Sequence, residues 1–295
     1  MLRPAATVID WGRASACFQR FPAPPSQSLV ESYMLQIAVI NESTAISDDD
    51  VKNMIPAFDS QWNNELNDTW GVGEAGFTFV PKGTAPGAGS WWVVFLDDSD
   101  QAQALAYHDL TDEGLPISKV FVRTILADNA SVSVGATHEI CEMAVDPWLN
   151  SAYQDAQGVF WAGEVCDPVE DDQYGYEIDG ILVTDFVTPN WFGHEKAGDV
   201  IDQKMHAETP FQVLTGGYAQ KWDPQKGWQQ ITGEQAKRSK RAHAPPGSRR
   251  ERRARQWKNW RRSGPNTADD GGGTAPPRRL KTADDGGGTA PPSHK

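Results

Sequence analysis

The sequence lacks long apolar runs and has few cysteines. No apolar stretch approaches the roughly 18 to 20 residues that a membrane-spanning helix needs, and the densest one, residues 91–96, has the length of a strand. We therefore expect no membrane-spanning segment. The chain of 295 residues has three cysteines and no C-x-x-C pair, which excludes a disulfide-stapled scaffold and a thiolate zinc site.

The first 33 residues lack the continuous apolar segment and small-residue cleavage site of a secretory signal. Their scattered arginines and the Pro-rich stretch at residues 21–26 predict a disordered leader. Met34 opens directly onto a predicted strand, so it is an alternative start of the protein. We expect a soluble protein that is cytoplasmic or virion-associated rather than secreted.

Charge divides the chain into two parts of opposite sign. Residues 237–295 contain 16 basic and 5 acidic side chains, whereas residues 1–236 contain 11 basic and 35 acidic ones. The acidic part is rich in aromatic residues and is long enough to bury one sizeable core. We therefore predict one globular domain over residues 34–235 and a basic tail over residues 236–295.

The basic tail has low complexity, because the segment TADDGGGTAPP occurs at residues 267–277 and again at 282–292. Such repeats cannot bury a core, so we expect the tail to be disordered. Its arginines and interleaved tryptophans are typical of segments that bind nucleic acid or another polyanion. The residues proposed for that role are Arg249, Arg250, Arg252, Arg253, Trp257 and Trp260. A solvated arm, or an arm that binds the acidic domain, is the alternative.

The order of apolar patterns along residues 34–235 predicts an α+β fold with two main helices. A strand at residues 35–40 precedes an amphipathic helix that starts after Ser47 and runs to about Trp70. A second helix is expected from about residue 131 to 145, stopped by Pro147. Beyond it the pattern is irregular, with a hairpin within residues 211–231. Further strands are expected at residues 77–80, 91–96, 104–108 and 117–122.

The second predicted helix carries the sequence THEICEM, in which His138 and Glu142 are four residues apart. Side chains at this spacing leave a helix from one face and can reach a single ion. Glu139 lies beside them, where metal-dependent hydrolases place the general base that takes a proton from the attacking water. The alternative for so short a motif is an ordinary helix with a solvated acidic face.

The composition around this motif favours a bound cation. The helix is apolar nearly all round, so His138, Glu139 and Glu142 should be buried with it. Buried charge needs a partner, and the sequence has no Lys or Arg between Arg123 and Lys196.

The motif resembles the active-site helix of the zincin metallopeptidases, whose signature is His-Glu-x-x-His, and the resemblance spans residues 34–190. It implies a mixed sheet packed on two helices, with an irregular C-terminal subdomain. It also implies that residues 104–108 form an antiparallel edge strand along the substrate cleft. Glu142 stands where the family pattern has the second His. One divalent ion, with zinc the leading candidate, is expected on one imidazole and two carboxylates.

The resemblance to the gluzincin subgroup implies Glu164 as the third ligand, within the sequence GEVCDP, and Asp167 as a residue that orients His138. Asp146 is a competing third ligand, or it ends the helix and accepts hydrogen bonds near the site. Cys166 could ligate the ion or form a disulfide with Cys141. His108 and the remaining histidines stand alone in sequence, and we expect surface or hydrogen-bonded roles for them.

Two functions from different classes follow. The first is a metal-dependent hydrolase that cleaves peptide bonds in a peptide or protein substrate. The second is a non-catalytic structural or interaction protein on the same fold, for example a virion component, with a tail that binds polyanions. The motif is similar to His-Glu-x-x-Glu sequences of phage and bacterial proteins, so the non-catalytic interpretation stays open.

Overall fold

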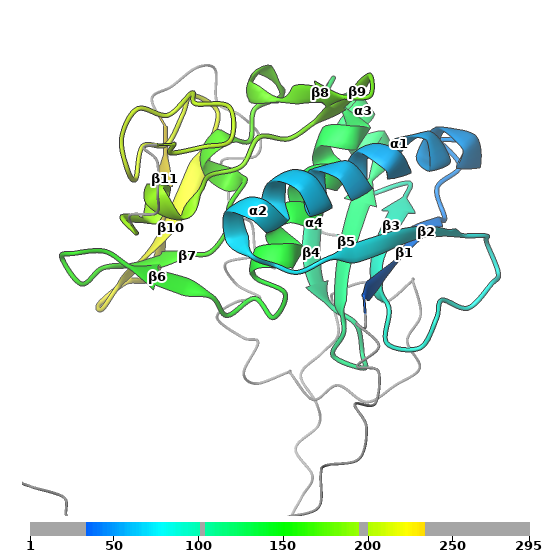
Figure 1. The fold of residues 1–295 in the computed structure, drawn as a ribbon, viewed down its shortest axis with the longest axis horizontal. Helices are drawn as coiled ribbons and strands as arrows, with labels where there is room; N and C mark the ends of the chain where they lie inside the picture. The colour runs from blue at the N-terminus through cyan, green and yellow to red at the C-terminus, as the bar shows by residue number, and fades with distance from the viewer. Residues whose placement is uncertain (1–33, 101–103, 195–199, 234–295) are drawn as a thin grey trace, which may run out of the picture. The chain divides into compact units, whose positions relative to one another are not determined.

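The computed structural model describes residues 34–100, 104–194 and 200–233. These residues form an α+β fold with a mixed five-stranded sheet in the order β2-β1-β3-β5-β4 (Figure 1). Neighbouring strands are parallel except at the edge, where β4 runs antiparallel to β5. The five strands are β1 (Leu35–Asn41), β2 (Ala75–Val80), β3 (Trp91–Leu96), β4 (Ala106–Leu110) and β5 (Pro116–Phe121).

Apolar side chains are buried on both faces of the sheet. Alternate residues of a strand point to opposite faces, so neighbouring residues of β1 belong to different clusters. Ile37 and Val39 of β1 belong to the large core cluster, which also includes residues of the helices. Ala38 and Ile40 belong to a smaller cluster on the opposite face. Burial on both faces explains why these strands have continuous apolar runs instead of an alternating pattern.

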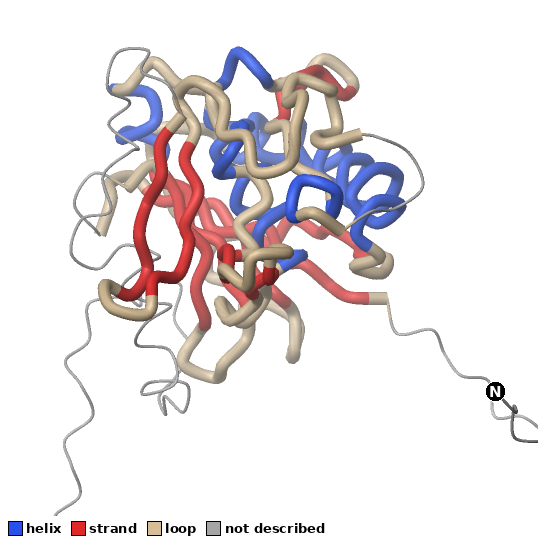
Figure 2. Tube along the Cα trace, turned by 90° about the vertical axis from the view of Figure 1, so that its left-hand side faces the viewer, coloured by secondary structure: helices blue, strands red, loops and turns tan. Residues whose placement is uncertain are grey.

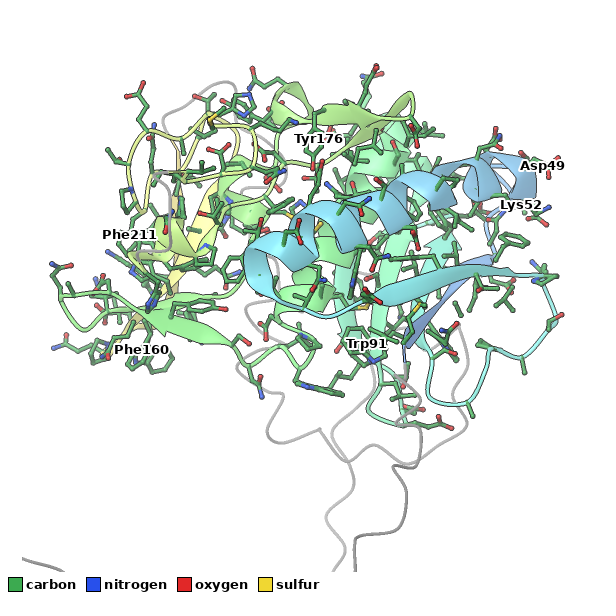
Figure 3. The ribbon with its side chains drawn as sticks, in the orientation of Figure 1. Asp49, Lys52, Trp91, Phe160, Tyr176 and Phe211 are labelled. Carbon is green, nitrogen blue, oxygen red and sulfur yellow. The ribbon has the colours of Figure 1, made fainter. Side chains whose placement is uncertain are left out.

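The long first helix is a composite of α1 (Asp48–Ser60), a π-helical segment (Gln61–Leu66) and α2 (Asn67–Trp70). Ser47 and Asp50 form a capping box at its start, in which each side chain accepts from the other's backbone N–H. The helix ends at Gly71, whose φ of 69° is left-handed. Figure 3 shows Tyr176 beside the π segment, where its hydroxyl donates to Glu65.

The second helix, α4 (Val132–Val145), packs against β4 and β5 and is buried on nearly all sides. Every residue except Gly135 and Val145 is buried. Thr137 ties it to the following chain, since its hydroxyl accepts from the Thr184 N–H at 2.9 Å and donates to the Ser133 carbonyl at 2.8 Å. The sequence did not predict the short helix α3 (Val122–Ala127) that precedes α4.

The chain after α4 is less irregular than the sequence suggested. Four short strands form an antiparallel sheet in the order β11-β10-β7-β6, and β8 pairs with β9. The expected hairpin is present as β10 and β11, the two longest strands of this sheet, which lie side by side in Figure 2. The bounds are β6 (Ala152–Gln154), β7 (Phe160–Ala162), β8 (Tyr176–Ile178), β9 (Ile181–Val183), β10 (Tyr218–Asp223) and β11 (Gly227–Thr232). Single 3-10 turns occupy Asp167–Val169, Asp172–Tyr174 and Pro189–Phe192.

Two groups of sequence expectations lie outside the described residues. These are the leader at residues 1–33 and the basic tail with its proposed polyanion-binding residues, Arg249, Arg250, Arg252, Arg253, Trp257 and Trp260. Within the described ranges, no helix is both long and apolar enough to cross a membrane.

Gly217 allows a close approach between the end of the domain and the turn that carries Asp167. A Cβ atom at this position would lie 2.5 Å from the Pro168 carbonyl oxygen and 2.8 Å from that of Asp167. These obstacles are backbone atoms, so they cannot move aside as a flexible side chain could.

We therefore expect Gly217→Ala to lower the free energy of unfolding by about 1–3 kcal/mol, the usual cost of overpacking. Urea unfolding followed by tryptophan fluorescence measures the change. Gly87→Ala is the matched control, because its added methyl would meet only the hydroxyl oxygen of Ser90 at 3.1 Å. Equal effects of the two substitutions would contradict the close-approach argument.

Candidate metal centre

Helix α4 places a row of ionisable groups in the protein interior. Glu142 is 0% exposed, Glu139 is 1% exposed and His138 is 5% exposed. Asp146 follows at the C-cap, where it ends the helix as expected and is also fully buried. The sequence expectation that α4 buries its charges is therefore confirmed.

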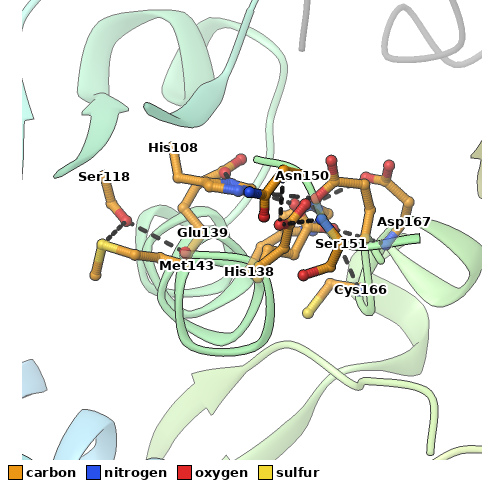
Figure 4. Close-up of polar contacts among 12 residues, drawn as sticks. His108, Ser118, His138, Glu139, Met143, Asn150, Ser151, Cys166 and Asp167 are labelled. Atoms are coloured by element: carbon orange, nitrogen blue, oxygen red, sulfur yellow. Dashed lines mark hydrogen bonds and ion pairs between the residues drawn. The ribbon is translucent and has the colours of Figure 1, made fainter. Parts of the chain in front are cut away.

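Glu142, His138 and Asp167 form the first group of converging side chains. The Nε2 atom of His138 lies 3.3 Å from Glu142 Oε1 and 3.3 Å from Asp167 Oδ1. The backbone N–H groups of Cys166 and Asp167 also donate to Glu142 Oε1, at 3.3 and 3.2 Å. Figure 4 shows His138 of α4 close to Cys166 and Asp167. One imidazole and two carboxylates are thus within reach of a single ion.

His108 joins the same cluster from β4, and this is the main residue that the sequence analysis missed. It is 0% exposed, so the alternative of a surface role is wrong. Its Nδ1 atom lies 3.2 Å from Glu139 Oε2 and 3.8 Å from Glu142 Oε2, and its Nε2 atom lies 3.8 Å from Glu164 Oε2.

The register of the sheet edge explains where His108 points. His108 pairs with Ser118 across the β4–β5 ladder, so both side chains lie on the same face. The Ser118 hydroxyl donates to the Glu139 carbonyl at 3.2 Å, which fixes that face as the one covered by α4. The sequence did hold one indication that His108 belongs to the site. The strand expected along the substrate cleft, residues 104–108, ends at this histidine.

Glu164 and Asp146 complete a second group with His108, in which one ligand atom of each residue lies within 4.8 Å of the others. Asp146 Oδ1 accepts hydrogen bonds from the backbone N–H groups of Asn150 and Ser151, both at 2.8 Å. Asp146 therefore acts as the hydrogen-bond acceptor that the sequence suggested, and it also faces the cluster.

The expected ligand set His138, Glu142 and Glu164 is divided between these two groups. The group that contains both His138 and Glu142 is completed by Asp167, which the sequence analysis had assigned to orienting His138. Glu164 stands instead with His108 and Asp146. Glu139 belongs to a third, overlapping group with His108 and Glu142.

The carboxylates control the protonation of both histidines. Burial by itself lowers the pKa of His138, but the charge of Glu142 and the hydrogen bonds to Asp167 and Glu142 outweigh it and raise the pKa well above its usual value. Burial also opposes protonation of His108, yet Glu139, Glu164 and Glu142 together raise its pKa. Without a metal, both imidazoles therefore tend to hold a proton, which a bound cation would displace.

The donor chemistry of the cluster fits a divalent cation. Five carboxylates (Glu139, Glu142, Asp146, Glu164 and Asp167) are buried with two imidazoles. Among the described Lys and Arg residues, Lys119 is the one that is buried, and its ammonium group pairs with Asp100 at 3.0 Å. Lys119 neighbours Ser118 in β5, so its side chain leaves the opposite face of the sheet from α4.

The cysteines do not contribute ligands to these groups. Cys141 and Cys166 are both buried thiols that form no disulfide. Burial and the hydrogen bond with Cys141 raise the pKa of Cys166 well above its usual value, which favours the neutral thiol over the thiolate that binds metals.

No family model, curated protein or solved structure matches the chain. The interpretation of the site therefore rests on its geometry and chemistry.

A separate group lies outside this cluster, where Asp185, Asp202 and His206 converge. Asp202 accepts backbone N–H groups of its own loop, among them those of Lys204 at 3.1 Å and His206 at 3.0 Å. Burial, followed by the hydrogen bond to Asp202, raises the pKa of Asp185 to about 9. Asp185 is therefore protonated at neutral pH, and it also lies 3.0 Å from His206 Nδ1 through its Oδ2 atom.

We expect Asp185→Asn to flatten the pH dependence of stability. The folded pKa of about 9 lies above the ordinary 3.8, so the contribution of Asp185 to stability is complete below pH ~4 and is lost as the pH rises towards 9. An amide can donate to Asp202 without titrating, so the variant should gain stability relative to the wild type as pH rises. Thermal melts from pH 5 to 9 measure this, with the exposed Asp68→Asn as control. A parallel pH dependence of variant and wild type would contradict the raised pKa of Asp185.

Proposed function

We propose that this protein is a metal-dependent hydrolase that cleaves peptide bonds. The observation that carries the proposal is the buried convergence of His138 Nε2, Glu142 Oε1 and Asp167 Oδ1, with Glu139 beside them on α4. A divalent ion bound by these groups would act as a Lewis acid on the scissile carbonyl and on the attacking water.

The donor set narrows the choice of ion. One imidazole and two carboxylates are harder ligands than the sites with two or three histidines that zinc often occupies, but zinc accepts carboxylate oxygen. Zn²⁺ is therefore proposed, with Mn²⁺ the first alternative. The backbone N–H groups of Cys166 and Asp167 donate to Glu142 Oε1 and so orient this carboxylate towards His138.

Glu139 is proposed as the general base. Its carboxylate follows the ligand His138 directly in sequence, and its Oε2 atom lies 3.2 Å from His108 Nδ1. His108 thereby positions the carboxylate, while the backbone of α4 ties it to His138. Glu139 would accept a proton from the attacking water and deliver it to the leaving amine.

The sheet edge next to α4 supports a peptide as the substrate. Among the described strands, β4 pairs with β5 alone and stands at the edge of the sheet, the position at which an extended peptide can add as a further strand. The arrangement of a mixed sheet, an antiparallel edge strand and a helix carrying His-Glu-x-x-Glu resembles the N-terminal subdomain of the zincins, which bind peptides along that strand.

Two substitutions on α4 separate the roles of its carboxylates. Glu139→Gln should lower the hydrolysis rate by about 10²- to 10⁴-fold, because it removes the base, and should leave the bound metal in place. Glu142→Ala should lose the ion held by His138 and Asp167, and hydrolysis with it, because it removes a ligand of that ion. A peptide-library cleavage assay, with metal content measured on the same samples, tests both outcomes.

Glu177→Gln is the matched control, because it makes the same carboxylate-to-amide change at an exposed position of β8. Glu177→Gln should change neither the metal content nor the rate of peptide cleavage. Wild-type protein that holds metal but cleaves no peptide, together with a silent Glu139→Gln, would favour the non-catalytic interaction protein. Wild-type protein that holds no metal would reject the hydrolase proposal.

A further inference from the structure

The buried cluster contains two ligand groups that share no residue. The first is His138, Glu142 and Asp167, and the second is His108, Asp146 and Glu164. Each group offers one imidazole and two carboxylates, and every member is buried. The proposed function places an ion at the first group and uses one member of the second, His108, only to position Glu139.

The cluster offers more donor side chains than one ion uses. It contains five buried carboxylates and two buried imidazoles, whereas a zinc ion in a protein usually takes three or four side-chain ligands. The two groups use six of these seven side chains without sharing one, and Glu139 is the seventh.

His108 provides an independent indication of a ligand at the second group. Its Nε2 atom is fully buried and has no hydrogen-bond partner among the described residues. This nitrogen faces Glu164, whose Oε2 atom lies 3.8 Å away, beyond hydrogen-bonding distance. The other ring nitrogen, Nδ1, lies 3.2 Å from Glu139 Oε2, an arrangement that orients the ring in the way carboxylates orient metal-bound histidines.

We propose that His108, Asp146 and Glu164 bind a second divalent cation beside the site of His138, Glu142 and Asp167. Glu142 lies between the two groups, since its Oε1 atom is 3.3 Å from His138 Nε2 and its Oε2 atom is 3.8 Å from His108 Nδ1. Ligands of this type suit Zn²⁺ or Mn²⁺. The second ion shares the cluster with the proposed hydrolase centre, but its binding can be measured without any substrate.

Metal counting tests this proposal directly. The full-length chain is stripped with a chelator and dialysed against Zn²⁺ buffered at a low free concentration, so that weak surface sites stay empty. Metal per chain is then measured by mass spectrometry. We expect two ions per wild-type chain, and one ion for His108→Ala and for Glu164→Gln.

His138→Ala should also retain one ion, because the second group keeps all its ligands. His194→Ala removes an exposed imidazole and is the matched control, which should keep two ions. Near-ultraviolet circular dichroism confirms that each variant is folded, and Glu164→Gln preserves side-chain volume in case His108→Ala does not fold.

Several outcomes would overturn the assignment. One ion per wild-type chain, unchanged in His108→Ala and Glu164→Gln but lost in His138→Ala, would leave the proposed hydrolase centre intact and reject the second ion. Two ions in His108→Ala and Glu164→Gln, with one lost in His206→Ala, would place the second ion at the Asp185 group instead. No metal in the wild type would reject both sites.

Discussion

The burial of α4 is the constraint on which the rest of the structure depends. This helix places His138, Glu139 and Glu142 where water cannot solvate them, and removing charge from water without compensation costs several kcal/mol per group. Polar groups from the surrounding chain provide hydrogen-bond and ion-pair partners for these buried side chains. Strand β4 contributes His108, and the turn after β7 contributes Asp167 and two backbone N–H groups. Elements far apart in sequence therefore meet at α4 because each satisfies part of its polar surface.

Much of the architecture could be predicted because it depends on local patterns. Strand β3 has the expected bounds, β1 differs by one residue, and Ser47 caps the first helix as its sequence suggested. The π-helical segment at Gln61–Leu66 was not foreseen, since its composition does not differ from that of the flanking α-helix. The short strands β6 and β7 were also missed, because each has three residues and is defined by its partners.

The site was predictable only where its residues are neighbours in sequence. The spacing of His138, Glu139 and Glu142 follows from helix geometry, and the structure buries all three as expected. His108 lies 30 residues away from His138, and its position depends on the β4–β5 register, which no local pattern encodes. The choice between Asp167 and Glu164 as the partner of His138 depends on the path of an irregular turn. For that reason the sequence indicated both residues but not their arrangement.

The carboxylate at position 142 links the proposed centre to the proposed second ion. In the zincin pattern that the motif resembles, an imidazole stands at this position. Glu142 instead adds a fifth carboxylate to the cluster and presents a second oxygen towards His108. An imidazole could not do this while also accepting the N–H groups of Cys166 and Asp167, because its second nitrogen carries a proton when the first accepts. Glu142 thus adds a carboxylate at the place where a second set of ligands is available. If two ions bind, their binding free energy also stabilises the fold, because β4, α4 and the turn that carries Asp167 each contribute ligands.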